Sequence, residues 1–262
     1  FCRGSCVFEA RRFNVICRMA LSTVRCVVFD LDDTLWCTSS TLDRAHEAMV
    51  EALVARHPSV AAQYGSREAF KAQMQHTMDT NPQRHHDFTF LRKETIQRLT
   101  QDDVITKDVY DLWFEQRNRP CFFPGALEAL SALRREGLLL GSLTDGNADP
   151  STISGLAELL DFSISAREAG ASKPDQRMFS LCEERSGCRS DEIVMVGDNV
   201  AKDVLGAQRA GWRAIWVKPP GSQSTVHTLE GPQQKAEVEA SPLATISHVR
   251  DVLGVLRACA HL

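Results

Sequence analysis

Two aspartates separated by a single residue directly follow a short apolar run. Residues 27–29 are two valines and a phenylalanine, and Asp30-Leu31-Asp32 comes next. Such residues favour a buried strand, on which side chains two positions apart point to the same side. Asp30 and Asp32 are therefore expected to share one pocket, where two carboxylates need a positive group to compensate their charge.

Five more polar residues follow, each close to an expected strand or loop end. They are Thr144, Asp145, Lys173, Asp198 and Asp203. In a parallel α/β sheet, ligands bind beyond the carboxyl ends of the strands. Taken singly, each of these residues is also explained as a helix cap, a turn residue or a surface charge. Their order along the chain and their common position at strand ends favour one shared site.

Together these residues resemble the motifs of the haloacid dehalogenase-like (HAD) superfamily of phosphohydrolases. The resemblance covers residues 24 to 250 and comprises D-x-D-x-T at 30–34, the Thr144 segment, Lys173, and G-D-x-x-x-x-D at 197–203. The dehalogenases that give the superfamily its name lack the second aspartate, which is Asp32 in this chain. The sequence therefore looks like that of a phosphatase.

The resemblance implies a role for each matching acidic residue. Asp30 would be the nucleophile that forms an aspartyl-phosphate, and Asp32 would protonate the leaving alcohol and then activate water. Mg²⁺ would be held by Asp30, by the backbone carbonyl of Asp32 and by Asp198. Asp203 would either contact Mg²⁺ or orient the metal shell or Lys173.

The resemblance also places three residues around the substrate phosphate. Thr144 and Lys173 would bind its non-bridging oxygens. Asp145 stands where the family often has asparagine, so it adds negative charge at the phosphate site. It either weakens substrate binding or points away and caps the following turn.

An all-helical insert is expected between the first two motifs, because residues 37–120 show helical periodicity and no strand pattern. Its position matches the small helical cap of one HAD subgroup, which closes over the site and excludes water. The cap is expected to select the substrate.

Within this insert, residues 84–92 resemble the cap of bacterial and plastid flavin mononucleotide phosphatases and related riboflavin-pathway phosphatases. Phe88 or Trp36 would stack on a planar ring, and His86 or Arg92 would reach its polar edges. In the alternative interpretation, the aromatic residues form the cap core and the histidines lie in a solvated loop.

The rest of the chain alternates helical and strand patterns, which predicts an α/β fold with a doubly wound parallel sheet, the Rossmann-like HAD core. Residues 19–36 and 121–262 would form this core. Strands are expected near 25–30, 138–143, 162–165, 192–196, 213–217 and 243–246. Helices are expected near 66–79, 88–100, 106–117, 125–135, 150–160, 175–186, 200–210 and 248–258. A long surface loop is expected over 218–241.

Composition narrows the classes of partner. A formal net charge of −4 gives no basic footprint for nucleic acid, and no apolar run approaches the length of a membrane span. The expected partner is a small phosphorylated metabolite, bound by a monomer or homodimer.

The nine cysteines are scattered and odd in number, which favours reduced thiols in an intracellular protein.

Residues 1–18 contain four arginines and a single acidic residue. They are either a non-structural extension before a start at Met19 or a targeting segment. The expected location is cytoplasmic, or a plastid or mitochondrion if this segment is a targeting signal. Functional alternatives are a nucleotidase or phosphomutase on the same scaffold, and a catalytically silent HAD-fold binding protein.

Overall fold

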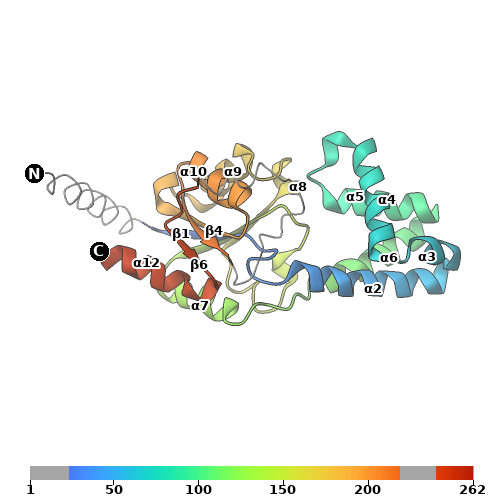
Figure 1. The fold of residues 1–262 in the computed structure, drawn as a ribbon, viewed down its shortest axis with the longest axis horizontal. Helices are drawn as coiled ribbons and strands as arrows, with labels where there is room; N and C mark the ends of the chain where they lie inside the picture. The colour runs from blue at the N-terminus through green and yellow to red at the C-terminus, as the bar shows by residue number, and fades with distance from the viewer. Residues whose placement is uncertain (1–23, 219–239, 262) are drawn as a thin grey trace, which may run out of the picture.

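Six parallel strands form one sheet in the order β3-β2-β1-β4-β5-β6 (Figure 1). The structure is a computed structural model that describes residues 24–218 and 240–261. The strands are β1 (Cys26–Phe29), β2 (Leu139–Thr144), β3 (Phe162–Ser165), β4 (Ile193–Gly197), β5 (Arg213–Val217) and β6 (Ala244–Ile246). The predicted doubly wound α/β fold is confirmed. The strand order reverses between β1 and β4, and this switch point is where open α/β sheets bind ligands.

The central strand β1 is buried on both faces, because its side chains alternate between two apolar layers. Val27 and Phe29 pack with one pair of helices, and Cys26 and Val28 pack against the opposite pair (Figure 1). The first pair is α7 (Ala126–Arg135) and α12 (Val252–His261), and the second is α9 (Gln176–Ser186) and α10 (Leu205–Arg209). Burial on both faces fixes the register of β1, and with it the position of Asp30.

An all-helical unit, hereafter the cap, is inserted between β1 and β2. Its elements are α2 (Thr38–Arg56), α3 (Pro58–Tyr64), α4 (Arg67–Thr80), η1 (Pro82–Arg84), α5 (Phe88–Thr100) and α6 (Asp103–Arg117). The cap has its own apolar core, which includes Met49, Leu91 and Trp113. The two helices α2 and α6 pack side by side and join the cap to the sheet (Figure 1).

The last cap helix starts earlier than its apolar pattern predicts. It begins at Asp103 instead of residue 106, because the Asp102 carboxylate accepts hydrogen bonds from the backbone N–H groups of Val104 and Ile105 at 2.8 and 2.9 Å. A side-chain cap of this kind satisfies the first N–H groups of a helix.

The prediction of a helix over 150–160 is wrong. Only the short 3₁₀ turn η2 (Pro150–Thr152) forms there, followed by irregular turns. Gly155 adopts φ = +80°, a left-handed conformation that interrupts an α-helix. The helix expected over 200–210 is divided into a π-helical turn, η4 (Val200–Val204), and α10.

The remaining short elements lie at the ends of strands or helices. They are α8 (Ala166–Ala169), η3 (Ser190–Glu192) and η5 (Val249–Asp251). The predictions for residues 1–18, and for nearly all of the loop at 218–241, concern positions outside the described ranges. Within the described ranges, no helix is both long and apolar enough to cross a bilayer.

Candidate active site

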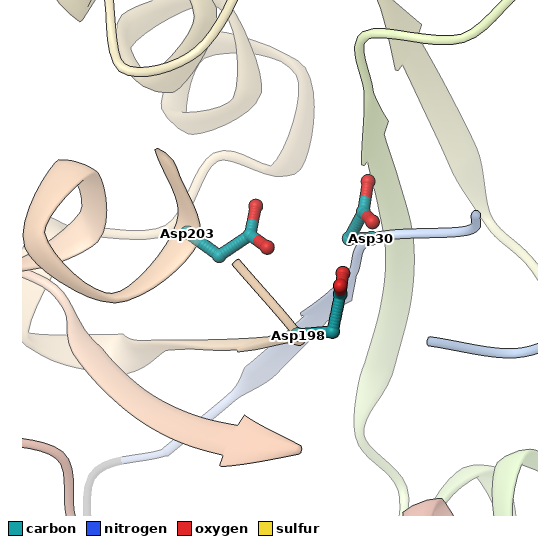
Figure 2. Close-up of side chains that lie close together, drawn as sticks. All are labelled: Asp30, Asp198 and Asp203. Atoms are coloured by element: carbon teal, nitrogen blue, oxygen red, sulfur yellow. The ribbon is translucent and has the colours of Figure 1, made fainter. Parts of the chain in front are cut away.

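Three carboxylates meet at the switch point of the sheet. Asp30 directly follows β1, Asp198 directly follows β4, and Asp203 lies in η4. One carboxylate oxygen from each residue lies within 4.8 Å of the other two. Figure 2 shows the three side chains directed toward a common space. Oxygen ligands in such a cluster suit a hard divalent cation such as Mg²⁺.

The ammonium group of Lys173 joins two of these carboxylates. Its Nζ donates to Asp30 Oδ1 at 2.6 Å and to Asp203 Oδ1 at 2.7 Å. Burial lowers the pKa of Lys173, but the carboxylates of Asp203, Asp30 and Asp145 outweigh that effect and raise it. The side chain is therefore a fixed positive charge beside Asp30.

One ammonium does not compensate three carboxylates. Burial raises the pKa of Asp30 well above its ordinary value, against the lowering effect of Lys173 and with a further contribution from Asp203. Burial, followed by the charges of Asp203 and Asp33, raises the pKa of Asp198 to about 7. Ionising all three carboxylates is therefore unfavourable, and a divalent cation held by these oxygens would compensate their charge.

The backbone around Asp198 orders this cluster. Thr34 Oγ1 donates to Asp198 Oδ1 at 3.3 Å, and the indole N–H of Trp216 donates to its backbone carbonyl at 2.9 Å. The Asn199 N–H donates to Asp203 Oδ2 at 2.9 Å. A Cβ atom on Gly197 would lie 2.3 Å from Asp203 Oδ2, so only glycine allows this approach.

Asp32 lies at the same edge of the sheet, and its carboxylate is held by three donors. Arg117 Nη2 donates to Oδ2 at 2.6 Å, and Oδ1 accepts from Trp36 Nε1 at 2.9 Å and from Thr38 Oγ1 at 3.1 Å. The Trp36 ring is fully buried, so the expected stacking of Trp36 on a substrate ring is wrong. Its role in the structure is to pack and to donate to Asp32.

Thr144 and Asp145 lie at the end of β2. Thr144 Oγ1 is buried and accepts the backbone N–H of Gly146 at 3.0 Å. Asp145 Oδ1 accepts the backbone N–H of Lys173, and its Oδ2 pairs with Lys202 Nζ, both at 2.8 Å. The expectation that Asp145 caps the following turn is therefore wrong, because both of its oxygens bind residues from later segments.

The glycine after Asp145 is required by a close approach. A Cβ atom on Gly146 would lie 2.4 Å from Asp32 Oδ2, 3.1 Å from Arg117 Nη2 and 3.2 Å from Thr144 Oγ1. The absence of a side chain at Gly146 thus lets the Thr144 segment pack against the Asp32–Arg117 pair.

The cap residues named from the sequence lie in different environments. Arg92 packs inside the cap, with its guanidinium 3.8 Å from the centre of the Trp113 ring and 5.3 Å from that of Phe70. Phe88 is partly buried against the same apolar core. His86 is half-buried in the turn between η1 and α5. The structure therefore gives Arg92 and Phe88 packing roles in the cap, and it brings neither to the carboxylate cluster.

Two basic residues of the site were missed by the sequence analysis. Arg117 ends the last cap helix, and Lys202 lies in η4. Arg117 lies outside the motifs of the resemblance, and Lys202 occupies an unspecified position of one of them. Lys202 is four residues from Asp198, within the G-D-x-x-x-x-D segment, and this proximity was the one available signal.

The chain thus combines a parallel α/β sheet, an acidic cluster at the switch point of that sheet, and a helical insert between β1 and β2. The haloacid dehalogenase-like hydrolase family matches residues 24–211. The chain belongs to this family and is an enzyme of the hydrolase class.

Individual relatives support the same assignment. The chain is 37% identical over 115 residues to a phosphoserine phosphatase of Thermus thermophilus, a match that spans 46% of that protein and 42% of this chain. It is 27% identical to the 5-amino-6-(5-phospho-D-ribitylamino)uracil phosphatase YigB of Escherichia coli, over 85% of that protein and 76% of this chain. A crystal structure of a 2-haloacid dehalogenase from Pseudomonas syringae is similar with a TM-score of 0.73, at 27% identity, over 99% of that chain and 90% of this one.

Proposed function

We propose that this hydrolase is a Mg²⁺-dependent phosphatase that cleaves a small phosphate monoester through an aspartyl-phosphate on Asp30. The observation that carries the proposal is the contact of Lys173 Nζ with Asp30 Oδ1 at 2.6 Å, in a cluster with Asp198 and Asp203. This contact supports the proposal, because a fixed positive charge beside Asp30 would attract a dianionic phosphoryl group to the nucleophile.

The residues of the site supply the parts of such a reaction. Asp30 attacks phosphorus while Asp32 gives a proton to the departing ester oxygen. Asp32 then takes a proton from the water that attacks the aspartyl-phosphate, which releases inorganic phosphate and restores Asp30. Lys173 and Thr144 hold the non-bridging oxygens. Mg²⁺, held by Asp30, Asp198 and the backbone carbonyl of Asp32, would supply charge neutralisation for the transferring group.

The substrate is the finer part of the proposal. The similarity to the riboflavin-pathway phosphatase of Escherichia coli supports flavin mononucleotide or a riboflavin-pathway phosphate as candidates. Of the cap residues named from the sequence, His86 is half-buried in a turn, whereas Phe88 and Arg92 pack against the cap core, so His86 is our candidate for selecting among them. A small phosphorylated metabolite as partner, and a cytoplasmic or organellar location, remain predictions.

A second candidate function is dehalogenation of a 2-haloacid, because a dehalogenase is the solved structure described above at a TM-score of 0.73. Asp32 favours the phosphatase. A carboxylate that exchanges a proton with the leaving group is needed when an alcohol departs, and it is not needed when a halide departs.

One experiment tests both candidates. Purified protein is incubated with Mg²⁺ and a panel of phosphate monoesters that includes flavin mononucleotide, and phosphate release is measured beside chloride release from 2-chloropropionate. We expect phosphate release that chelation by EDTA abolishes, and no chloride release. Chloride release without phosphate release would refute the proposal in favour of a dehalogenase.

A further inference from the structure

Arg117 is an unusual residue for its position. Its side chain is 2% exposed, and its one ion pair among the described residues is with Asp32, through Nη2 at 2.6 Å. The Nε and Nη1 atoms are buried and have no hydrogen-bond partner in the described part of the chain. Burying a guanidinium with two unpaired nitrogens is unfavourable, so a residue of this kind calls for a functional explanation.

The surroundings of Arg117 point to Asp32 as the object of that function. Asp32 accepts hydrogen bonds from both segments that join the cap to the core. The donors are Trp36 just before α2, Thr38 at the start of α2, and Arg117 at the end of α6. Gly146 leaves just enough room for the Arg117–Asp32 contact. The carboxylate is thus fixed in one orientation by donors on both of its oxygens.

We propose that Arg117 is a positioning residue for Asp32, and this inference rests on the phosphatase function proposed above. The guanidinium holds the Asp32 carboxylate in the orientation in which it exchanges a proton, first with the departing ester oxygen and then with the attacking water. Arg117 itself transfers no proton and does not contact the substrate. Its removal leaves Asp30, Lys173 and Asp198 unchanged but lets the Asp32 side chain rotate.

Two esters separate this role from a merely structural one. p-Nitrophenolate departs without a proton, so transfer of the phosphoryl group from p-nitrophenyl phosphate to Asp30 does not need Asp32, whereas hydrolysis of the aspartyl-phosphate does. An alkyl ester such as glycerol phosphate needs Asp32 in both steps. Loss of positioning should therefore affect the two esters differently.

The test compares wild-type enzyme with Arg117→Met, which preserves volume and replaces the guanidinium by an apolar group. For p-nitrophenyl phosphate we expect kcat to fall about 10- to 100-fold with kcat/KM nearly unchanged, and a burst of p-nitrophenol to appear. For glycerol phosphate we expect kcat/KM itself to fall about 10- to 100-fold. The intact mass of acid-quenched variant should show accumulated phosphoenzyme, a readout that does not depend on turnover.

Two further variants complete the experiment. Arg119→Met is the matched control, because the Arg119 side chain lies two residues away, is 64% exposed and, among the described residues, forms its ion pair with Glu115 of α6. This variant should behave like wild type. Arg117→Gln must show the same split between the two esters, and it carries the test if Arg117→Met does not fold.

Equal losses on both esters, with no burst and no phosphoenzyme, would overturn the inference and leave Arg117 a structural anchor of α6. Wild-type activity in Arg117→Met would overturn it as well. Failure of the wild-type enzyme to hydrolyse either ester would instead refute the proposed phosphatase function.

Discussion

Acidic side chains at the carboxyl edge of the sheet are matched with basic side chains from distant segments. Lys173 contacts Asp30, Arg117 contacts Asp32, and Lys202 contacts Asp145. Asp198 has no such ion pair among the described residues. A divalent cation would therefore be held most favourably next to Asp198.

The first prediction concerns Asp145, which replaces the asparagine that the family often has. Asp145→Asn should lower KM for phosphate esters about 2- to 5-fold with kcat unchanged, because it removes a negative charge near the phosphate site and frees the partly exposed Lys202. Lys202→Met should raise KM, since the negative charge of Asp145 then lacks the positive charge of Lys202 beside it. Steady-state kinetics of both variants checks this, and a higher KM in Asp145→Asn would contradict it.

At the scale of residues, the sequence identifies the acidic residues of the proposed chemistry but not the basic side chains that contact them. Asp30, Asp32 and Asp198 can be recognised from residue type, spacing and order along the chain. The contact between Arg117 and Asp32 joins residues 85 positions apart, and it depends on where α6 ends relative to β1. Such a contact is set by tertiary packing, which a local pattern does not encode.

At the scale of elements, the start of α5 is fixed by an aspartate side chain. The Asp87 carboxylate accepts the backbone N–H of Phe90 at 2.9 Å and pairs with Arg84 at 2.8 Å. Burial acts to raise the pKa of Asp87, but the Phe90 hydrogen bond and Arg84 outweigh it and lower the pKa below its ordinary value. The ionised form of Asp87 is therefore the one that stabilises the helix start.

The second prediction follows from that shift. Asp87→Ala should destabilise α5 by about 1–2 kcal/mol at neutral pH, because a helix cap is lost. Since the folded-state pKa is lowered, the contribution is present above the unfolded value of about 3.9 and is lost as pH falls through the folded value. Hydrogen exchange of the α5 amides at several pH values measures it. A destabilisation that persists unchanged in acid would argue against a charge effect.

The third prediction separates two residues of the same segment. Arg92 packs on Trp113 in the cap core, so Arg92→Ala should lower the stability of the cap by about 1–2 kcal/mol and reduce activity on every ester by the same factor. His86→Ala should instead change the ranking among large esters and spare p-nitrophenyl phosphate. Kinetics on both ester types decides this, and a uniform loss in His86→Ala would remove His86 from substrate selection.

Most elements could be predicted because their apolar periodicity is strong. The strands over 162–165 and 213–217 match the structure at both ends. The prediction of a helix over 150–160 failed because Ile153 and Leu156 have helical spacing and are buried, although the chain between them is not helical. Gly155 adopts a positive φ there. The apolar pattern predicted which residues are buried, but it did not predict the backbone conformation.

At the scale of the whole molecule, the acidic cluster follows the carboxyl ends of the central strands β1 and β4. The cap is inserted directly after β1 (Figure 1). Alternation of helix and strand patterns was sufficient to predict the fold class. The relative placement of cap and core could not be predicted, because it depends on the packing of α2 and α6 and on the contacts of Arg117.

The fourth prediction is that Mg²⁺ stabilises the folded protein, because it compensates carboxylates that the unfolded chain does not bring together. At about 100 times its Kd, the ion should add about 2.7 kcal/mol and raise Tm by several degrees. The shift should be absent in Asp198→Ala and retained in Asp111→Ala, where an exposed cap carboxylate is removed. Calorimetry with Mg²⁺ and with EDTA provides the measurement. An equal shift of Tm in both variants would contradict the proposed Mg²⁺ site at Asp198.

The central claim is that Asp30 carries the phosphoryl group. It is tested most directly by the mass of the Asp32→Asn variant, acid-quenched during reaction with p-nitrophenyl phosphate and Mg²⁺. This variant should still transfer phosphate to Asp30, because p-nitrophenolate departs without a proton, but it should hydrolyse the intermediate slowly. We predict one added phosphoryl group, located on the peptide that contains Asp30 and absent when Asp30→Asn is introduced as well. An unmodified protein, or a phosphoryl group on another residue, would contradict the account.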